Sequence, residues 1–557
     1  MKSKKTGDLL LLANGIALVV VLNMLASLYF FRIDLTEEQR YTIKEPTRQL
    51  LSELTDDVFI EVYLEGDLNA GFQRLQRSVR ELLEEFRITS NNRIQFTFTN
   101  PEMALGKQAQ SEFMQDLAER GVSPLSVIDT KGGERIEKII FPGAIIEADG
   151  FETSVMLLKG DRTRGADQVL NQSIEGLEYE FASAIYKLTN TNRKKIGLLT
   201  GHGELDSLEI ASLNNALLDQ YEVRKVDITR RETIEGYDAI IVAKPRFTFS
   251  ERDKFKLDQY VMRGGKLLLM IDKMDAAMDS ASREDYFAFP YNLNLDDLLF
   301  RYGVRINPDL IQDRVAARYP IVTGQIGGQP QIVQMDWPFF PLVNSYADHS
   351  ITRNLDASFL KFASSIDTVK AVGVRKQLLA STSPASRAIG TPVNVSANSL
   401  RSLDPALLSQ GPIPVAYLLE GRFSSLYKNR FVPEGIAAEK VVEESEDTKI
   451  IVVSDGDLAR NNVNGRTGQP QQLGLDPISN YTFANEGLIL NMLAYLTEEE
   501  GLIIARNKEV KIRPLDKEKV SAERTFWQLL NIVLPLVLLA GIGLVKNQLR
   551  KRRYTKF

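Results

Sequence analysis

Six polar residues each come directly after an apolar segment that has the pattern of a buried strand. They are His202 and Glu204 after residues 195–200, Lys244 after 239–243, Asp272 after 266–271, and Asp455 and Asp457 after 449–453. The carboxyl ends of neighbouring parallel strands meet at one edge of a sheet, and α/β folds bind ligands at that edge. Imidazole and carboxylate groups are also competent metal ligands. The pattern therefore predicts a site for a polar ligand or a divalent ion at this edge.

The same six residues also have a structural interpretation, which stays open. Gly201 and Gly203 permit a tight turn from strand to helix, and acidic residues are common in the first turn of a helix. In that case His202 packs among its neighbours and binds nothing. We therefore name the six residues as candidates for ligand binding, and we assign no catalytic residue, no metal and no cofactor.

Several enzyme classes are excluded by residues that the sequence lacks. The 557 residues include no cysteine, which excludes disulfides, a thiol nucleophile and the second half of a zinc deaminase site around His202-x-Glu204. The other histidine, His349, is given no role, and no G-x-S-x-G motif for a serine hydrolase occurs. The phosphate-binding motif G-x-x-x-x-G-K-[ST] is also absent. We expect a protein that is not an enzyme.

The elements around the six candidates predict an α/β domain with a parallel sheet. Between the strand segments 239–243 and 266–271, apolar residues recur at helical spacing and end at Gly264 and Gly265. Strand, helix and strand in this order predict right-handed crossovers and a sheet buried on both faces. The closing strand, 449–453, lies far along the chain. Residues 291–445 are therefore predicted to be an inserted lobe, whose fold the pattern does not specify.

A first α/β domain is predicted upstream of this one. Strand segments at 58–64 and 94–98 flank a helix, and a second helix and strand segments near 127, at 138–146 and at 153–158 follow. The order β-α-β-α-β-β is that of a thioredoxin-like domain, although the missing cysteines exclude its redox chemistry. A helix over about 173–188 leads into the next domain. The apolar stripe of the first helix comprises Phe72, Leu75, Val79, Leu82, Leu83 and Phe86.

Both ends of the chain are predicted to span a membrane. Residues 9–31 and 526–545 are uncharged runs of 23 and 20 residues. At about 1.5 Å per helical residue, each can cross a hydrocarbon core of about 30 Å. Basic residues lie before the first run and after the second, so the positive-inside rule places both termini in the cytoplasm and residues 32–525 on the other side.

The net charge of −5 is unevenly distributed. Residues 1–8 carry +2 and residues 546–557 carry +6, so the remainder must carry −13. An acidic middle argues against nucleic-acid binding, which requires a positive surface. The basic tail can attract anionic membrane lipid.

Five sequence motifs, in order, resemble those of one protein family. They are Arg32-Ile-Asp-Leu-Thr36 with Arg40-Tyr-Thr42, Asn171-Gln-Ser-Ile-Glu175 with Leu177-Glu-Tyr-Glu-Phe181, Gly201-His-Gly-Glu204, Tyr260-Val-Met-Arg-Gly-Gly265, and Leu419-Glu-Gly-Arg-Phe423. Each motif alone is weak. Together, over nearly the whole chain, they resemble the GldG family of gliding-motility ABC transporter auxiliary proteins from Bacteroidetes.

This resemblance implies a non-ATPase component of an ABC system, often labelled substrate-binding, that works with an ATP-binding subunit and a multi-span permease. It implies the bacterial inner membrane, a large periplasmic region, gliding motility, and motility or secretion components as further partners. It also implies that the second domain is similar to class I amidotransferase-like or flavodoxin-like folds, here without the nucleophile. No catalytic residue is carried over.

The predicted organisation follows from these points. It comprises a cytoplasmic N-terminus (1–8), a membrane helix (9–31), a thioredoxin-like domain (32–190), the first part of the amidotransferase-like domain (191–290), the inserted lobe (291–445), the closing part with a linker (446–525), a membrane helix (526–545) and a cytoplasmic tail (546–557). Two other functions stay open. One is a periplasmic metal-dependent hydrolase that uses His202, Glu204, Asp272 and Asp455; the other is a structural tether for the motility or secretion machinery.

Overall fold

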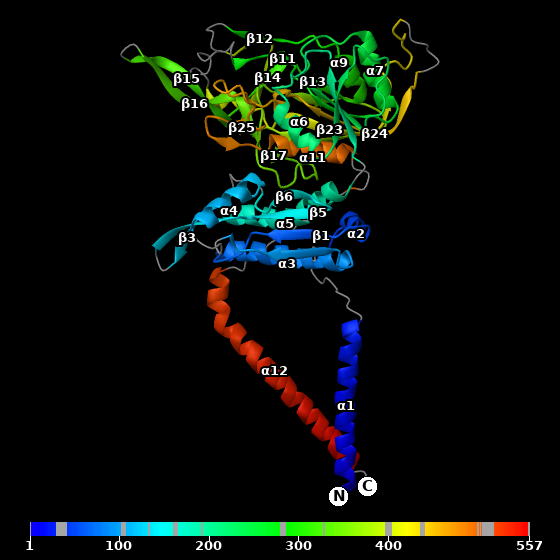
Figure 1. The fold of residues 1–557 in the computed structure, drawn as a ribbon, viewed down its shortest axis with the longest axis vertical. Coiled ribbons are helices and arrows are strands. Elements are labelled where there is room, and N and C mark those ends of the chain that lie inside the picture. The colour runs from blue at the N-terminus through cyan, green and yellow to red at the C-terminus, as the bar shows by residue number, and fades with distance from the viewer. Residues whose placement is uncertain are drawn as a thin grey trace. The chain divides into compact units, whose positions relative to one another are not determined.

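The structure is a computed structural model (Figure 1). It describes residues 2–28, 42–101, 107–131, 134–159, 165–190, 193–278, 286–326, 329–395, 404–434, 441–497, 501, 503 and 517–554, and every structural statement below concerns these residues. The chain separates into two compact units, Met1–Lys508 and Glu509–Phe557, which are described one at a time.

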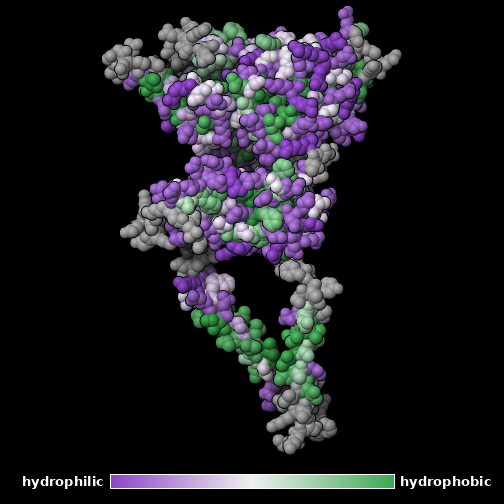
Figure 2. All heavy atoms as spheres, in the orientation of Figure 1, coloured by the Kyte–Doolittle hydropathy of each residue, from purple (hydrophilic) through white to green (hydrophobic). Residues whose placement is uncertain are grey.

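The second unit contains the helix α12, Lys517–Tyr554. Its stretch Ala522–Leu549 is long and apolar enough to cross a membrane, and it contains the predicted span 526–545. Pro535 lies inside this helix, as a membrane helix tolerates. Hydrophobic side chains cover the middle of α12, whereas the visible face of the folded domains is mostly hydrophilic (Figure 2).

The N-terminal helix α1, Lys2–Leu28, overlaps the other predicted span. Within the part of α1 whose side chains are described, Leu12–Met24 is an apolar stretch, and it lies inside the predicted span 9–31. Residues 29–31 of the predicted span lie outside the described residues. Among the residues whose side chains are described, α12 is the helix that meets the length and composition of a membrane span.

The first α/β domain contains a four-stranded sheet in the order β2-β1-β5-β6. Strands β1 and β2 are parallel, and β5 is antiparallel to both β1 and β6. The predicted strand over 138–146 is split into β4 and β5, and the hairpin β3-β4 forms a separate two-stranded sheet. The bounds are α2 Glu45–Ser52, β1 Val58–Val62, α3 Ala70–Thr89, β2 Ile94–Phe98, α4 Lys107–Glu119, β3 Leu125–Lys131, β4 Glu134–Ile140, β5 Gly143–Ala148, β6 Phe151–Met156 and α5 Ala166–Thr189.

The helix α3 packs its predicted stripe against this sheet. Five of the six stripe residues are buried in one core with residues of β1, β5 and α5, and Leu82 packs at the edge of that core. Asn69 caps the start of this helix, because its side-chain oxygen accepts hydrogen bonds from the backbone N–H groups of Gly71 and Phe72. The helix α4 contributes Leu117 to a separate cluster with Tyr63 and Ile145.

The second domain is built on an eight-stranded sheet in the order β17-β20-β23-β24-β10-β9-β7-β8. The five strands from β24 to β8 are parallel, and β23, β20 and β17 continue the sheet in antiparallel fashion. The strand bounds are β7 Lys195–Thr200, β8 Glu222–Asp227, β9 Ala239–Ala243, β10 Lys266–Met270, β17 Ser345–Tyr346, β20 Val374–Ser381, β23 Pro414–Ser424 and β24 Glu444–Val453. The predicted closing segment 449–453 lies within β24 and pairs with β10.

Both faces of this sheet are buried, as continuous apolar strands require. Alternate residues of each central strand enter two different cores: in β9, Ile241 faces one core and Ile240 the other. The helices α6, Ala211–Leu218, and α11, Asn485–Thr497, cover the first face. The helices α7, Glu251–Met262, and α9, Asp296–Tyr302, cover the second (Figure 1).

The predicted inserted lobe, residues 291–445, supplies three strands to this sheet, so part of it continues the domain around it. Other strands of this region form small antiparallel sheets, of which the longest hairpin is β15-β16. An aromatic core that includes Trp337, Phe339 and Phe340 lies among them. The further bounds are β11 Met274–Asp275, β12 Phe287–Pro290, β13 Val304–Ile306, β14 Asp309–Asp313, β15 Ala316–Ile326, β16 Gln329–Val343, β18 Ser358–Phe359, β19 Ile366–Thr368, β21 Ser386–Gly390, β22 Val393–Asn394, β25 Leu475–Asp476 and β26 Tyr481–Thr482.

Candidate functional site

Four of the six candidate residues meet at the carboxyl ends of the parallel strands. Lys244 follows β9, and its Nζ lies 2.7 Å from Oδ2 of Asp272 and 2.5 Å from Oδ2 of Asp457. Asp272 follows β10, and the loop after β24 carries Asp455 and Asp457. All four side chains are buried. We call these four residues the lysine–aspartate cluster.

The backbone at this edge is shaped to bring the four residues together. Lys244 has a φ of 55°, a conformation that residues other than glycine rarely adopt and that often marks a functional turn. Gly456 lies against it, since a Cβ atom at Gly456 would be 2.5 Å from the Cβ of Lys244. The N–H of Gly456 donates to Oδ1 of Asp272 at 2.5 Å. A side chain at position 456 would therefore push the two strand ends apart.

The pKa values of the three carboxyl groups in the cluster shift in different directions. Burial raises the pKa of Asp272, and Lys244 offsets only part of this effect. Burial also raises the pKa of Asp455, whose oxygens accept hydrogen bonds from the backbone N–H groups of Asp457 and Lys361. For Asp457, burial is outweighed by the positive charges of Lys244 and Lys361, which lower its pKa. Asp457 is thus the carboxyl group of the cluster whose ionised form its surroundings favour.

This arrangement suits an ammonium group better than a metal ion. Carboxylate oxygens of Asp272, Asp455 and Asp457 lie within 4.8 Å of one another, a spacing that a divalent ion could use. However, the Lys244 ammonium stands within hydrogen-bond distance of two of them. Burial would lower the pKa of Lys244, but Asp272 and Asp457 raise it, so the lysine stays protonated there. A metal ion would have to displace it.

The other two candidates, His202 and Glu204, lie in a separate group after β7. The His202 ring stacks on Phe249 at 3.7 Å between centroids, and its Nε2 lies 3.4 Å from Oδ2 of Asp253. Its Nδ1 faces Oε1 of Glu204 at 3.9 Å, and neither atom has a hydrogen-bond partner among the described residues. The side chain of His202 therefore contacts Phe249, Asp253 and Glu204 and belongs to a group separate from the lysine–aspartate cluster.

The burial of His202 makes the stability of the folded protein depend on pH. It lowers the pKa of His202, an effect that Asp253 only partly opposes, so the folded protein favours the neutral ring. The unfolded chain takes up this proton near its ordinary pKa of about 6.5, so stability is lost as the pH falls below that value. We expect wild type to lose up to about 1.4 kcal/mol more per pH unit than His202→Gln in this range.

Urea unfolding of both proteins between pH 7.5 and pH 5.5 measures this difference. Glu204, Asp227, Asp253 and Lys256 are charged groups that act on the ring, and they are shared by the two proteins. Equal losses of stability would show that the folded state does not exclude the proton from His202.

A cavity of about 900 Å³ opens beside the lysine–aspartate cluster. Lys244 and Asp457 line it, together with residues that the sequence analysis does not name. Arg246 and Arg460 follow the strand ends by only a few residues, so the rule that selected their neighbours could have found them. Lys361 lies in the region 291–445, where no strand order was predicted, and only the fold brings it here.

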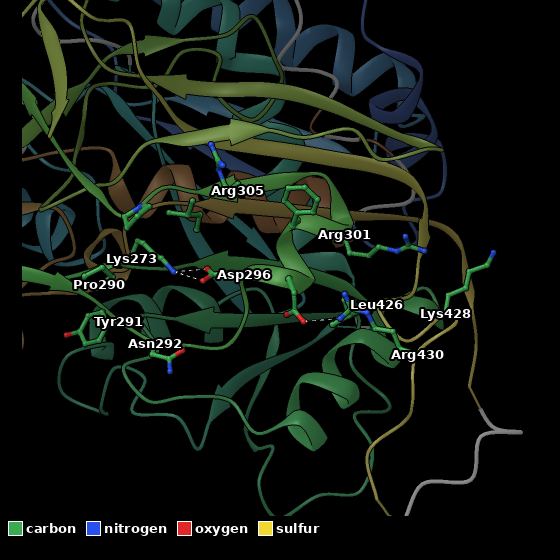
Figure 3. A pocket seen from close by; sticks show the side chains of 14 residues that line it. Lys273, Pro290, Tyr291, Asn292, Asp296, Arg301, Arg305, Leu426, Lys428 and Arg430 are labelled. Carbon is green, nitrogen blue, oxygen red and sulfur yellow. Dashed lines mark hydrogen bonds and ion pairs between the residues drawn. The ribbon is translucent and has the colours of Figure 1, made fainter. Parts of the chain in front are cut away.

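A second cavity, of about 810 Å³, lies around α9 and the loop after β23 (Figure 3). Five basic residues line it, and four of them pair with carboxylates: Lys273 with Asp296, Arg305 with Asp367, Lys428 with Glu444 and Arg430 with Asp297. The fifth, Arg301, donates from Nε to the carbonyl oxygens of Ser424 and Ser425. Most of the positive charge in this cavity is thus already neutralised.

Comparison with known proteins finds similarity to one family and one domain. A family model described as an ABC-type uncharacterized transport system matches residues 193–492, which include all strands of the eight-stranded sheet. A domain of unknown function (DUF7088) matches residues 37–147. An uncharacterized protein of Borreliella burgdorferi is 22% identical over 571 residues, which cover 99% of this chain and 100% of that protein.

Among solved structures, the mmIFT52 N-terminal domain is similar to part of the chain. The match has 16% sequence identity and a TM-score of 0.32, and it covers 54% of this chain and 97% of that one.

Proposed function

We propose that this chain, which belongs to the ABC-type uncharacterized transport system family, is a non-catalytic, membrane-anchored subunit working beside a separate ATP-binding subunit and a multi-span permease. Membership of this family makes it a transport-related auxiliary protein that associates with an ABC transporter, and its apolar C-terminal helix associates it with a membrane. The observation that carries the proposal is the match over 193–492, which includes the whole lysine–aspartate cluster.

The charge pattern supports the proposed topology. Basic residues precede the apolar part of α1 and follow that of α12, so both termini face the cytoplasm and residues 32–525 face the periplasm of the inner membrane. One or two helices cannot enclose a pathway for a solute, so a permease with more helices must supply it. We therefore propose that α1 and α12 dock the auxiliary subunit beside such a permease.

The candidate site supports binding over catalysis. The carboxylates of the lysine–aspartate cluster are held by Lys244 and by backbone N–H groups, and the chain has no thiol nucleophile. Side chains that pair with one another can line a binding cavity, but they offer no free acid or base for catalysis. On these grounds we propose that the chain is not an enzyme.

The finer parts of the proposal rest on the motif resemblance. They are membership of the GldG group, a role in gliding motility with motility or secretion components as partners, and a thioredoxin-like domain followed by an amidotransferase-like domain. The element order of the first domain, with the hairpin β3-β4 added, supports the thioredoxin-like assignment.

Purification of the tagged full-length protein from its native membranes tests the central proposal. We expect an ABC ATP-binding subunit and a permease to copurify in fixed ratio. A variant that lacks both residues 1–31 and residues 517–557 should leave the membrane fraction and lose both partners. Adding the auxiliary subunit to the reconstituted transporter should change its rate of ATP hydrolysis. Repeated recovery of the chain alone would contradict the proposal, and an unchanged rate in the assembled complex would favour a structural tether.

A further inference from the structure

Lys361 differs from the other basic residues that line the cavity beside the lysine–aspartate cluster. Its Nζ lies 3.4 Å from Oδ1 of Asn462, and no carboxylate among the described residues forms an ion pair with it. The other basic lining residues all have such a partner: Lys244 pairs with Asp272 and Asp457, Arg246 and Arg460 with Glu209, and Arg318 with Asp336. Lys361 is therefore the basic residue of this wall that has no ion-pair partner among the described residues, and the acidic residues Glu209, Asp275, Asp457 and Asp476 line the same cavity.

The position of Lys361 is fixed by the cluster itself. Its backbone N–H donates to Oδ2 of Asp455 at 2.6 Å, so the start of its side chain is tied to the strand ends. The ammonium lies 5.0 Å from the centroid of Phe359 and 6.0 Å from that of Phe340. Aromatic faces attract a cation but do not neutralise it. Burial accordingly lowers the pKa of Lys361, and an anion placed beside the ammonium would relieve that cost.

The rest of the wall is suited to an apolar group. Tyr319, Phe340, Phe359 and Phe362 line the same cavity as Lys361. Its volume of about 900 Å³ is within the range of roughly 300–1,000 Å³ that small-molecule sites occupy. It also lies beyond the carboxyl ends of the parallel strands, where open α/β sheets bind ligands.

We propose that this cavity binds a small organic anion, in which a carboxylate or phosphate group pairs with Lys361 and an apolar or aromatic body packs against the phenylalanine rings. This inference deepens the proposed auxiliary role, on which it rests, by naming the chemical class of the ligand. A cationic ligand is disfavoured because it would meet the unpaired ammonium. A small inorganic anion alone would leave the aromatic wall unused.

Calorimetric titration of the full-length protein in detergent tests the ligand class with five probes. Benzoate and phenyl phosphate carry both features and distinguish the two anionic groups. Benzyl alcohol keeps the ring without the charge, acetate keeps the charge without the ring, and benzylamine reverses the charge. We expect one or both aromatic anions to bind at least tenfold more tightly than the other three probes.

Variants then assign the binding to Lys361. We expect Lys361→Met to weaken binding of the aromatic anion at least tenfold and Lys361→Arg to retain most of it. Lys370→Met is the matched control, because Lys370 is an exposed lysine of the same region that does not line the cavity, and it should bind as wild type does. Near-ultraviolet circular dichroism checks that each variant is folded.

Three results would overturn the inference: equal binding of benzylamine and benzoate, unchanged binding in folded Lys361→Met, or no binding of any probe at millimolar concentration. The probe series on wild type tests the proposal even if Lys361→Met does not fold. Copurification with the transporter is scored separately on Lys361→Met. A complex that assembles without binding the probes rejects only this inference, whereas failure of the wild-type chain to copurify rejects the proposed function.

Discussion

Lys244→Met is expected to lower the free energy of unfolding by about 3–5 kcal/mol, because it removes the buried ammonium that pairs with both Asp272 and Asp457 and leaves Asp457 only its ion pair with Arg460. The methionine side chain has nearly the same length, so the loss reports mainly on charge. Burial already raises the pKa of Asp272, and both acids should become harder to ionise once the ammonium is gone. Chemical unfolding at pH 7 measures the change.

Two further variants separate charge from shape at this position. Lys244→Arg keeps the positive charge, but the larger guanidinium group fits less well between the carboxyl groups of the cluster. We therefore expect a smaller loss of stability than with methionine. Replacing Asp272 and Asp457 by asparagine together with Lys244→Met removes the uncompensated charges and should recover part of the stability. If Lys244→Met were as stable as wild type, the buried ion pair would not exist in solution.

Trp337→Ala is also expected to lower the free energy of unfolding by about 3–5 kcal/mol, since it opens a large cavity in the aromatic core of the inserted region. Trp337 is fully buried, and its ring centroid lies 5.9 Å from that of Tyr319 and 6.2 Å from that of Phe339. It lies on β16, which pairs with both β15 and β18. The loss should therefore destabilise several strands of this region together.

Trp337→Phe is the matched control for this prediction. The indole Nε1 of Trp337 has no hydrogen-bond partner among the described residues, so replacing it by phenylalanine sacrifices no hydrogen bond. We expect a loss well below that of alanine, measured as a shift in the thermal or urea midpoint. Equal losses for the two variants would mean that the ring volume is not what stabilises this core.

Local sequence patterns were sufficient to predict an element where the interactions that form it are between residues close in sequence. The stripe of α3 is one case, because a helix buries residues at three- and four-residue spacing whatever it packs against. The central strands of the parallel sheet are another, since a strand that is buried on both faces must be continuously apolar. The strand-end rule also selected Lys244, Asp272, Asp455 and Asp457, which the structure brings together.

The same rule did not separate His202 and Glu204 from these four residues. It ranks residues by their distance from a strand end, whereas side-chain direction depends on the turn that follows. After β7, Gly201 and Gly203 both have positive φ, and the turn they form places His202 on Phe249. Periodicity carries no information about such a turn, so the separate group could be seen only in three dimensions.

The sequence by itself determined the apolar C-terminal helix, the absence of any thiol, the buried parallel strands and the lysine and aspartates at their ends, because each depends on composition or short-range spacing. Only the tertiary structure decided that region 291–445 extends the sheet with β17, β20 and β23, and that Lys361 reaches the cavity beside Asp457. Both outcomes depend on contacts between residues far apart in the chain. Such contacts are set by packing and strand pairing and leave no periodic pattern in the sequence.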